Sequence, residues 1–196
     1  MALAGGETPR PIYAELARVP AASIPWDRAE VFFTDERAVP PDDPQSNYRM
    51  VEETLLARLA IARPQVHRME AERPDLDAAA RDYEALLPPR LDVLLLGMGP
   101  DGHTASLFPG GVAVSEHTHR VVPVVGPKAP ARRLTITPPV VALARRVAVV
   151  AGGIDKAEAT ARALEGPFSP TQVPVQIALG GTWFLDRAAA ARLKSR

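Results

Sequence analysis

The chain contains no cysteine, and this absence excludes several kinds of chemistry at once. A protein without thiols has no disulfide, no thiolate nucleophile and no zinc site built on thiolates. Disulfide-free chains are compatible with a reducing compartment, and we therefore expect a cytoplasmic protein.

Long apolar runs and an excess of one charge are also missing. No apolar run approaches the roughly 18 residues that a membrane span needs, and the N-terminal MALAGG lacks the features of a signal peptide. Basic and acidic residues number 23 each, so no overall field attracts nucleic acid or a membrane. An anion site would have to be local. We expect one domain, residues 1–196, with a full core of its own.

The chain is organised around residues 91–111, LDVLLLGMGPDGHTASLFPGG. The apolar run 93–96 has no two-residue alternation, which favours a buried parallel strand. It ends in Gly97, Gly99 and Gly102, which suit positive φ or close approach to a ligand. We expect a tight turn and then a short helix over 104–108, ended by Pro109. Ligands bind beyond the carboxyl ends of such strands, so His103 would stand at the mouth of a site.

The same glycines form a G-x-G-x-x-G pattern, which also occurs in dinucleotide-binding folds. That fingerprint opens a long helix and is followed by an acidic residue about 20 positions later. Here only five residues separate the turn from Pro109, so NAD or FAD binding is disfavoured. A tight loop with a buried histidine remains the plain alternative.

Elsewhere, strands and helices alternate, which predicts an α/β fold: a doubly wound, mostly parallel sheet with helices on both faces. The expected strands, besides the central one, are 26–34, 120–125, 132–137, 147–151, 175–179 and 182–185. The expected helices are 9–19, one from Ser46 and Asn47 to about 59, 74–87, 155–164, and a last one capped by Asp186.

The N-terminus predicts an anion site and a shortened first strand. Gly5, Gly6 and Thr8 precede a helix that starts at Pro9, where free N–H groups can bind an anion; an ordinary strand-to-helix turn is the alternative. Almost no strand precedes this turn, so the first strand looks truncated. The strands around Val31 and Val93 would then lack a partner. We therefore expect either about 30 to 40 further residues upstream or a homodimer that covers the gap; a monomer is the other possibility.

Three further groups of polar residues are candidates for a site. Asp35, Glu36 and Arg37 follow a strand and could present a carboxylate and a guanidinium to a polar anionic substrate. Lys156, one of only three lysines, follows a glycine turn at a helix start and suits a phosphate, although a surface lysine is an equal alternative. Arg133 lies on a strand whose alternation predicts one solvated face, shared with Thr135 and Thr137.

Other patterns do not support a site. His117 and His119 have a metal-like spacing beside Glu116, yet no further ligand is near them in the sequence, so we expect no metal site. His67 lies in an apolar patch and is expected to be structural. Ser106 is not in a G-x-S-x-G elbow and is not expected to be a nucleophile.

Five motifs, in this order and spacing, resemble the 6-phosphogluconolactonase family across essentially the whole chain: GGETP, FFTDERAVPPDDPQSNYRM, DVLLLGMGPDGHTASLFPG, RLTIT and GGIDK. The resemblance implies hydrolysis of 6-phospho-D-glucono-1,5-lactone to 6-phospho-D-gluconate, the second step of the oxidative pentose phosphate pathway, without a cofactor. Glu7 departs from the family's usual serine in GGSTP, which weakens one expected phosphate contact.

The chemistry of a lactone assigns roles to the candidates. A lactone is an activated ester, so His103 could act as the base for a water, with Asp101 orienting the imidazole. Asp35 would bind sugar hydroxyls or assist proton transfer, and amides of the glycine turns, including Gly99, could receive the oxyanion. By resemblance, the phosphate pocket comprises Arg37, Arg133, Lys156 and the turn of Gly5, Gly6 and Thr8.

Two alternatives remain on the sequence. A sugar-phosphate isomerase or deaminase of the same fold shares Asp101 and His103, but such deaminases carry a catalytic glutamate at the place of Phe108. A non-enzymatic sugar-phosphate sensor should carry a basic DNA-binding helix. No segment of the sequence predicts one.

Overall fold

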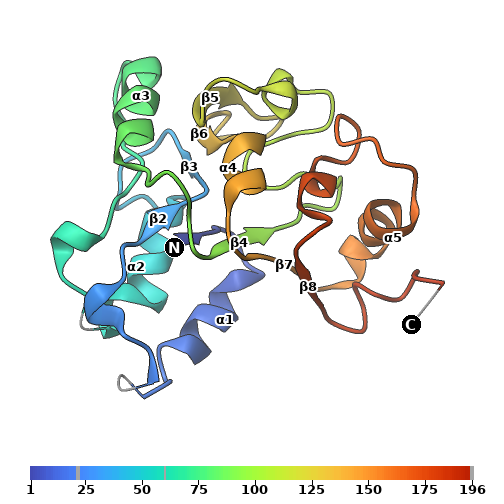
Figure 1. Cartoon of the computed structure of the whole chain (residues 1–196), viewed down its shortest axis with the longest axis horizontal. Coiled ribbons are helices and arrows are strands. Elements are labelled where there is room, and N and C mark those ends of the chain that lie inside the picture. Colours follow the sequence, from blue (N-terminus) through green and yellow to red (C-terminus); the bar gives the residue numbers. More distant parts are fainter. Residues whose placement is uncertain (21–22, 60, 195–196) are drawn as a thin grey trace.

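The computed structural model of the chain describes residues 1–20, 23–59 and 61–194. Its centre is a five-stranded parallel sheet with helices packed around it (Figure 1). The strand order is β2-β1-β4-β7-β8, with β1 (Ala2–Leu3), β2 (Phe32–Phe33), β4 (Leu94–Gly97), β7 (Val147–Ala151) and β8 (Thr182–Leu185). The predicted α/β fold with a mostly parallel sheet is confirmed.

The central strands are apolar along their whole length because both faces of the sheet are covered. Leu94, Leu96 and Val149 are fully buried, and they share one core with Val31 and Phe33. Burial of this kind contributes about 1.5 to 3 kcal/mol for each large side chain. The parallel sheet is therefore a rigid base for the loops at its carboxyl edge.

Five α-helices and several short 3₁₀ segments connect the strands in the described part of the chain. Proline occupies the first turn of α1, where its missing N–H costs nothing. Leu76, Ala80 and Tyr83 of α3 are buried and lie on one side of the helix. In the described residues, no helix has both the length and the apolar character to cross a membrane. The α-helices are α1 (Pro9–Leu16), α2 (Asn47–Thr54), α3 (Leu76–Leu86), α4 (Pro138–Leu143) and α5 (Ala157–Glu165). The 3₁₀ segments are η2 (Trp26–Arg28), η3 (Leu56–Arg58), η4 (Arg63–Gln65), η5 (Val112–Ser115), η6 (Ile154–Lys156) and η7 (Pro174–Ala178).

A second, antiparallel sheet lies beside the first and was not predicted. It has the order β3-β6-β5, with β3 (Asp35–Arg37), β6 (Arg132–Ile136) and β5 (Val121–Val125). Thr34 joins the two sheets: its N–H donates to the carbonyl of Leu3 (3.0 Å), and its carbonyl accepts from Ile136 (2.9 Å). The three charged residues expected in a loop therefore form a strand, which brings them close to the carboxyl edge of the parallel sheet.

Four expected elements differ in the structure. Only 32–33 of the predicted strand 26–34 pair in the parallel sheet, and 26–28 form η2, which starts after Pro25. Residues 175–179, expected as a strand, lie almost entirely in η7, which opens with Pro174. The helix expected after Asp186 is a series of turns. Strand 132–137 has no solvated face, since the residues from Arg133 to Ile136 are buried beneath neighbouring elements.

The expected helix over 104–108 is also wrong. The segment is a tight turn closed by a bridge between Thr104 and Leu107, with Ala105 at φ +47°. A side chain in this left-handed region costs roughly 1 to 2 kcal/mol, so surrounding contacts must hold the turn. Ser106 supplies two of them, as described below.

The chain order places the crevice of the sheet between β1 and β4. From β1 the next strand, β2, lies on one side, whereas β4, β7 and β8 lie on the other, and ligands bind at such a switch point. The expected loss of partners around Val31 and Val93 is not observed. Short as β1 is, Ala2 donates to the carbonyl of Val93 (2.9 Å), and Phe32 donates to that of Met1 (2.8 Å).

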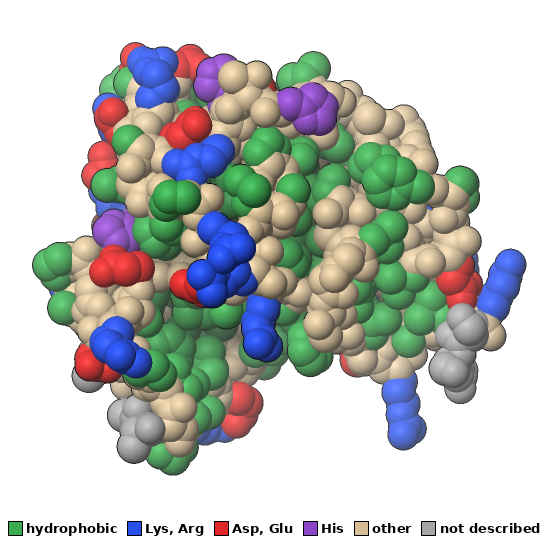
Figure 2. All heavy atoms as spheres, in the orientation of Figure 1, with side chains coloured by type: hydrophobic (Ala, Val, Ile, Leu, Met, Phe, Trp, Pro, Cys, Tyr) green, Lys and Arg blue, Asp and Glu red, His purple; other side chains and the backbone are tan. Residues whose placement is uncertain are grey.

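Charged side chains of both signs are interspersed on the surface. Figure 2 shows acidic and basic groups close to one another over the part of this face that holds α2 and α3. Salt bridges such as Arg63–Glu52 and Arg73–Asp82, both 2.7 Å, account for part of this pattern. On this face, the surface therefore carries no single-sign patch large enough to attract nucleic acid.

Candidate functional site

A cavity of about 530 Å³ opens at the carboxyl ends of β1 and β4. Nine of the ten residues predicted for the site line it, and Asp101 is bonded to one of the nine. The fold thus brings together segments from the start, the middle and the last third of the chain. The nine are Gly5, Gly6, Thr8, Asp35, Arg37, Gly99, His103, Arg133 and Lys156.

The turn after β4 is closed by its own amides. Gly99 donates its N–H to the carbonyl of His103 (2.8 Å), and Gly102, at φ +88°, donates to the carbonyl of Gly99 (3.0 Å). A Cβ on Gly99 would lie 2.1 Å from the His103 ring, so only glycine leaves room for the imidazole. Gly99 therefore provides space on the cavity wall, and its N–H is not available to an oxyanion.

His103 and Asp101 form a close pair. Nδ1 of His103 lies 2.5 Å from Oδ1 of Asp101, and the backbone N–H of His103 also donates to that oxygen (3.2 Å). Burial raises the pKa of the Asp101 carboxyl, but the hydrogen bond and charge of His103 lower it by more, to a pKa of about 2. An ionised carboxylate only accepts, so the proton of this pair lies on Nδ1; in the neutral form of the imidazole, the lone pair is then on Nε2. The imidazole is thus held in the tautomer of a general base.

Asp35 is buried, and both of its carboxylate oxygens contact neighbouring side chains. Ser106 Oγ donates to its Oδ2 at 2.6 Å, while Asn47 Nδ2 and Thr34 Oγ1 lie 3.3 Å from its Oδ1. The backbone N–H of Ser106 also donates to Oγ1 of Thr135 at 3.1 Å, which ties the turn to β6. The Ser106 hydroxyl is therefore committed to Asp35, in agreement with the expectation that it is not a nucleophile.

Arg37 and Arg133 lie directly opposite each other on β3 and β6. Like charges in this arrangement destabilise a sheet unless an anion lies between them. Burial lowers the pKa of Arg133, Asp35 opposes that shift, and the charge of Arg37 adds to it. The Arg37 guanidinium donates to the carbonyl of Gln45 (2.6 Å), which fixes its direction. Two opposed cations on the wall of one cavity indicate a site for an anion.

Two further glycine turns lie at or next to the cavity: the first lines it, and the second precedes Lys156, which lines it. Gly6 has φ +97° in the turn before α1, and Gly153 has the same φ in the turn after β7. The second turn is fixed by Asp186, whose Oδ2 accepts from the N–H of Gly153 at 2.9 Å. Lys156 follows it; its side chain is 14% exposed and Nζ lies 2.9 Å from Oδ2 of Asp155. An ammonium group is thereby held beside the Gly5 to Thr8 turn.

The residues on the cavity wall that sequence reasoning did not assign to the site include Arg10, Asn47 and Lys128. Ser46 and Asn47 were both candidate caps of α2; Ser46 is the cap, and Asn47 instead donates to the carbonyl of Asp35 at 2.8 Å. Arg10 lies one turn into the helix that follows GGETP, a position that could have indicated it. Lys128 lies in the β5–β6 hairpin, and apart from the scarcity of lysine nothing in the sequence indicated that it would line the site.

The cavity is consequently rich in positive charge. Five basic residues line it against two acidic ones, Glu7 and Asp35, although the whole chain has no net charge. The basic residues are Arg10, Arg37, Lys128, Arg133 and Lys156. Among the described residues no group of three or more His, Cys, Asp or Glu could hold a metal ion, His117 and His119 included. The arrangement suits a substrate with a strong anionic group next to a bond that a base can attack.

The chain resembles one protein family over nearly its whole length. The family described as glucosamine-6-phosphate isomerases/6-phosphogluconolactonase matches residues 1–184. A 6-phosphogluconolactonase of Mycobacterium tuberculosis is 43% identical over 192 residues, 89% of this chain and 77% of that one.

Solved structures agree with this resemblance. The crystal structure of 6-phosphogluconolactonase from Leishmania guyanensis superposes with a TM-score of 0.83 at 31% identity and covers 96% of this chain and 83% of that one. A monomeric glucosamine-6-phosphate deaminase superposes with a TM-score of 0.82 at 26% identity, over 98% of this chain and 87% of that one.

Proposed function

The chain belongs to the glucosamine-6-phosphate isomerase/6-phosphogluconolactonase family, and from this premise we propose that it hydrolyses 6-phospho-D-glucono-1,5-lactone to 6-phospho-D-gluconate. The observation that carries the proposal is an imidazole with a free Nε2 on the wall of a cavity that five basic side chains also line. The enzyme is a carboxylic ester hydrolase that acts on a phosphosugar lactone.

His103 supplies the base of the reaction. Nε2 takes a proton from a water molecule as the water oxygen attacks the lactone carbonyl carbon, and a tetrahedral oxyanion forms. The carbon–oxygen bond of the ring then breaks, and the imidazolium returns the proton to the departing ring oxygen. The ionised Asp101 carboxylate stabilises the imidazolium between these two steps and keeps Nδ1 as the protonated nitrogen.

The phosphate is held at the basic end of the cavity. Arg37 and Arg133 share a cross-strand position that an anion would stabilise, and Lys156 lines the same cavity as the Gly5 to Thr8 turn at the start of α1. Helix N-termini and guanidinium groups are both suited to phosphate oxygens. Glu7 replaces the serine typical of the family, and its side chain is 87% exposed and paired with Arg10 at 3.4 Å. The other groups therefore bind the phosphate without that hydroxyl.

Two roles follow from which groups are already bonded. The N–H groups of Gly99 and Gly102 bond within their own turn, so a basic side chain of the wall, not these amides, stabilises the oxyanion. The Asp35 carboxylate is bonded to Ser106 and Asn47, so its role is to orient this wall and accept from sugar hydroxyls.

Assays of the purified chain with two substrates distinguish lactone hydrolysis from the deaminase alternative. Freshly prepared 6-phosphogluconolactone and, separately, glucosamine 6-phosphate are supplied to the purified chain, and proton release and ammonia release are measured. We expect lactone hydrolysis well above the spontaneous rate and no ammonia. Ammonia release, or a lactone rate equal to the spontaneous one, would overturn the assignment.

A further inference from the structure

Phe108 touches two groups of the site without lining its cavity. Its ring centroid lies 4.9 Å from that of His103 at an interplanar angle of 47°, and the guanidinium carbon of Arg133 lies 5.4 Å from its centroid. No other aromatic ring of the described residues is recorded in contact with either group. One side chain therefore contacts both the base and one of the two opposed cations.

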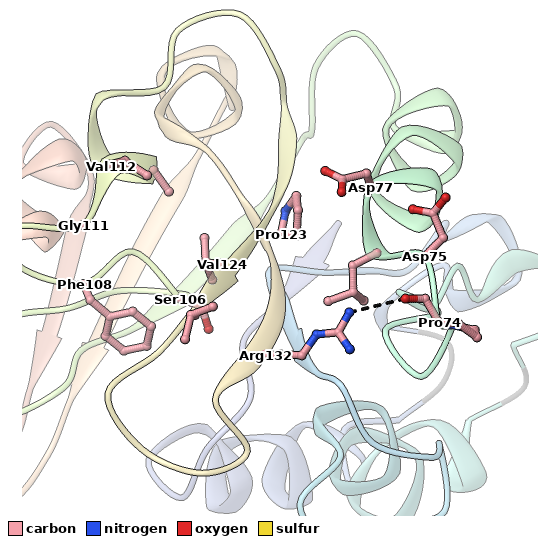
Figure 3. A pocket seen from close by; sticks show the side chains of 13 residues that line it. Pro74, Asp75, Asp77, Ser106, Phe108, Gly111, Val112, Pro123, Val124 and Arg132 are labelled. Carbon is pink, nitrogen blue, oxygen red and sulfur yellow. Dashed lines mark hydrogen bonds between the residues drawn. The ribbon is translucent and has the colours of Figure 1, made fainter.

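The Phe108 ring is packed closely against the β5–β6 hairpin. A Cβ on Gly126 would lie 3.0 Å from two carbons of the Phe108 ring and 3.1 Å from Nε of Arg133, so the hairpin between β5 and β6 packs closely on both. On its other side the chain is anchored by Ser106, which bonds to Asp35. Figure 3 shows Phe108 and Ser106 side by side on the wall of a second cavity, with Val124 next to them.

These contacts restrict the two polar groups in complementary ways. The imidazole of His103 has little freedom to turn: Asp101 bonds to Nδ1, and the backbone of Gly99 lies close to Nδ1 and Cε1. The Phe108 ring packs against the imidazole as a third contact. Nε of the Arg133 guanidinium donates to the carbonyl of Pro130 at 3.1 Å, but its two terminal nitrogens make only long hydrogen bonds, at 3.4 and 3.5 Å, so the contact with the aromatic face adds to what fixes the group.

We propose that Phe108 is a positioning residue for both halves of the reaction: it orients the His103 imidazole for proton transfer and holds Arg133 for the phosphate. The inference rests on the proposed function, because it assigns Phe108 a role toward that lactone. A small misplacement of a base can lower a rate by about 10²-fold, and a cation–π contact contributes about 0.5 to 1 kcal/mol.

The test compares Phe108→Leu, which keeps apolar volume but has no ring, with Val112→Ala. Val112 lines the second cavity, is 90% exposed and serves as the matched control. For Phe108→Leu we expect kcat to fall by roughly 10- to 100-fold. Calorimetry should show binding of 6-phosphogluconate weakened by about 2- to 5-fold. Val112→Ala should change neither.

A second variant separates positioning from general loosening. Gly126→Ala removes no functional group, but its added Cβ should displace the side chains of Phe108 and Arg133. We expect this variant to stay folded and to have a lower kcat, as Phe108→Leu does. In an Arg133→Met background, Phe108→Leu should no longer weaken 6-phosphogluconate binding, because the shared partner is gone.

The outcomes distinguish this inference from the proposed function. If the unmodified chain does not hydrolyse the lactone, the proposed function fails. If it does, and folded Phe108→Leu retains the full kcat and product affinity, the positioning role is wrong. An affinity loss of equal size in the Arg133→Met background would also contradict it.

Discussion

Two neighbouring cavities in the described part of the chain differ in size and lining, and we propose that the chemistry takes place in the smaller one. The larger, about 910 Å³, is lined mainly by apolar groups of α3, η5 and β5, with Asp75, Asp77 and Arg132 as its charged members. The smaller, about 530 Å³, holds the histidine, the opposed arginines and the glycine turns. Ser106 and Phe108 belong to the wall of the first and contact Asp35, His103 and Arg133 of the second.

The difference lies in what the side chains can still do. In the larger cavity, Asp75 caps α3 by accepting from Ala78 (2.9 Å), and Arg132 donates to the carbonyl of Pro74 (3.3 Å, Figure 3). Its polar groups hold the local structure. The smaller cavity is lined instead by His103 and by five basic side chains. Volume alone would select the larger cavity, whereas the cluster of basic side chains and the imidazole of His103 favour the smaller one.

The largest expected effect is that of His103→Asn. Loss of the base should lower kcat by roughly 10² to 10⁴ while the fold survives, because the side chain lies on a cavity wall. His119→Asn is the matched control, since the His119 side chain is 60% exposed and outside both cavities. Steady-state rates with freshly prepared lactone measure this effect. Normal turnover by folded His103→Asn would show that His103 is not the base.

Asp101→Asn should have the next largest effect. An amide can donate to Nδ1 and so favour the tautomer with its proton on Nε2, which should lower kcat on the order of 10²-fold. Asp92→Asn is the control, because the Asp92 side chain is 77% exposed. A folded Asp101→Asn protein with unchanged kcat would show that the pair is not part of the mechanism.

The same substitution should change the response to acid. The pKa of Asp101 is lowered to about 2 in the folded protein, from 3.8, so its stabilising contribution is present above about pH 4 and is lost as the pH falls towards 2. The unmodified chain should therefore lose stability relative to Asp101→Asn over that interval. Thermal unfolding across it measures this; parallel curves for the two proteins would contradict it.

Substitutions of the cations should come next. Lys156→Met and Arg37→Met should each weaken 6-phosphogluconate binding by about 1.5 to 3 kcal/mol, the range for a charge-assisted hydrogen bond, and gluconate binding much less. Arg81→Met, an exposed arginine of α3, is the control. Calorimetry with both ligands separates the cases, and equal losses for the two would mean that these residues do not read the phosphate.

The smallest effect is expected in the larger cavity. Val112→Ala removes apolar surface from its rim, where the side chain is 90% exposed. Exposed substitutions of this kind change stability by less than about 0.5 kcal/mol, and kcat should stay within about twofold. A rate loss as large as that of Asp101→Asn would show that the two cavities are not functionally distinct.

Much of the fold and of the site was predictable from local patterns. Residues 93–96 and 147–151 are apolar without alternation, so parallel strands follow from the need to bury both faces. The glycines at 97, 99 and 102 indicated the turn that carries His103. Because carboxyl ends of parallel strands share one edge, residues far apart in the sequence could be expected together.

What could not be predicted depends on pairing between distant segments. Asp35 to Arg37 read as loop charges, and only their register with Arg133 to Thr135 makes them a strand. The turn 104–108 is set by Ser106 bonding to Asp35, 71 residues away, which overrides any helical tendency. Asn47 looked like a helix cap because the carbonyl it binds belongs to that unforeseen strand.

The most direct test of the central claim is to locate the bound product. Nuclear magnetic resonance spectra of the isotope-labelled chain, recorded as 6-phosphogluconate is added, report which amides and histidine side chains respond. Our account predicts that the signals of Gly5, Gly6, His103 and Lys156 shift with saturation, while those of Val112 and Val125 stay in place. Shifts confined to Val112, Val125 and their neighbours would place the product in the larger cavity and contradict the account.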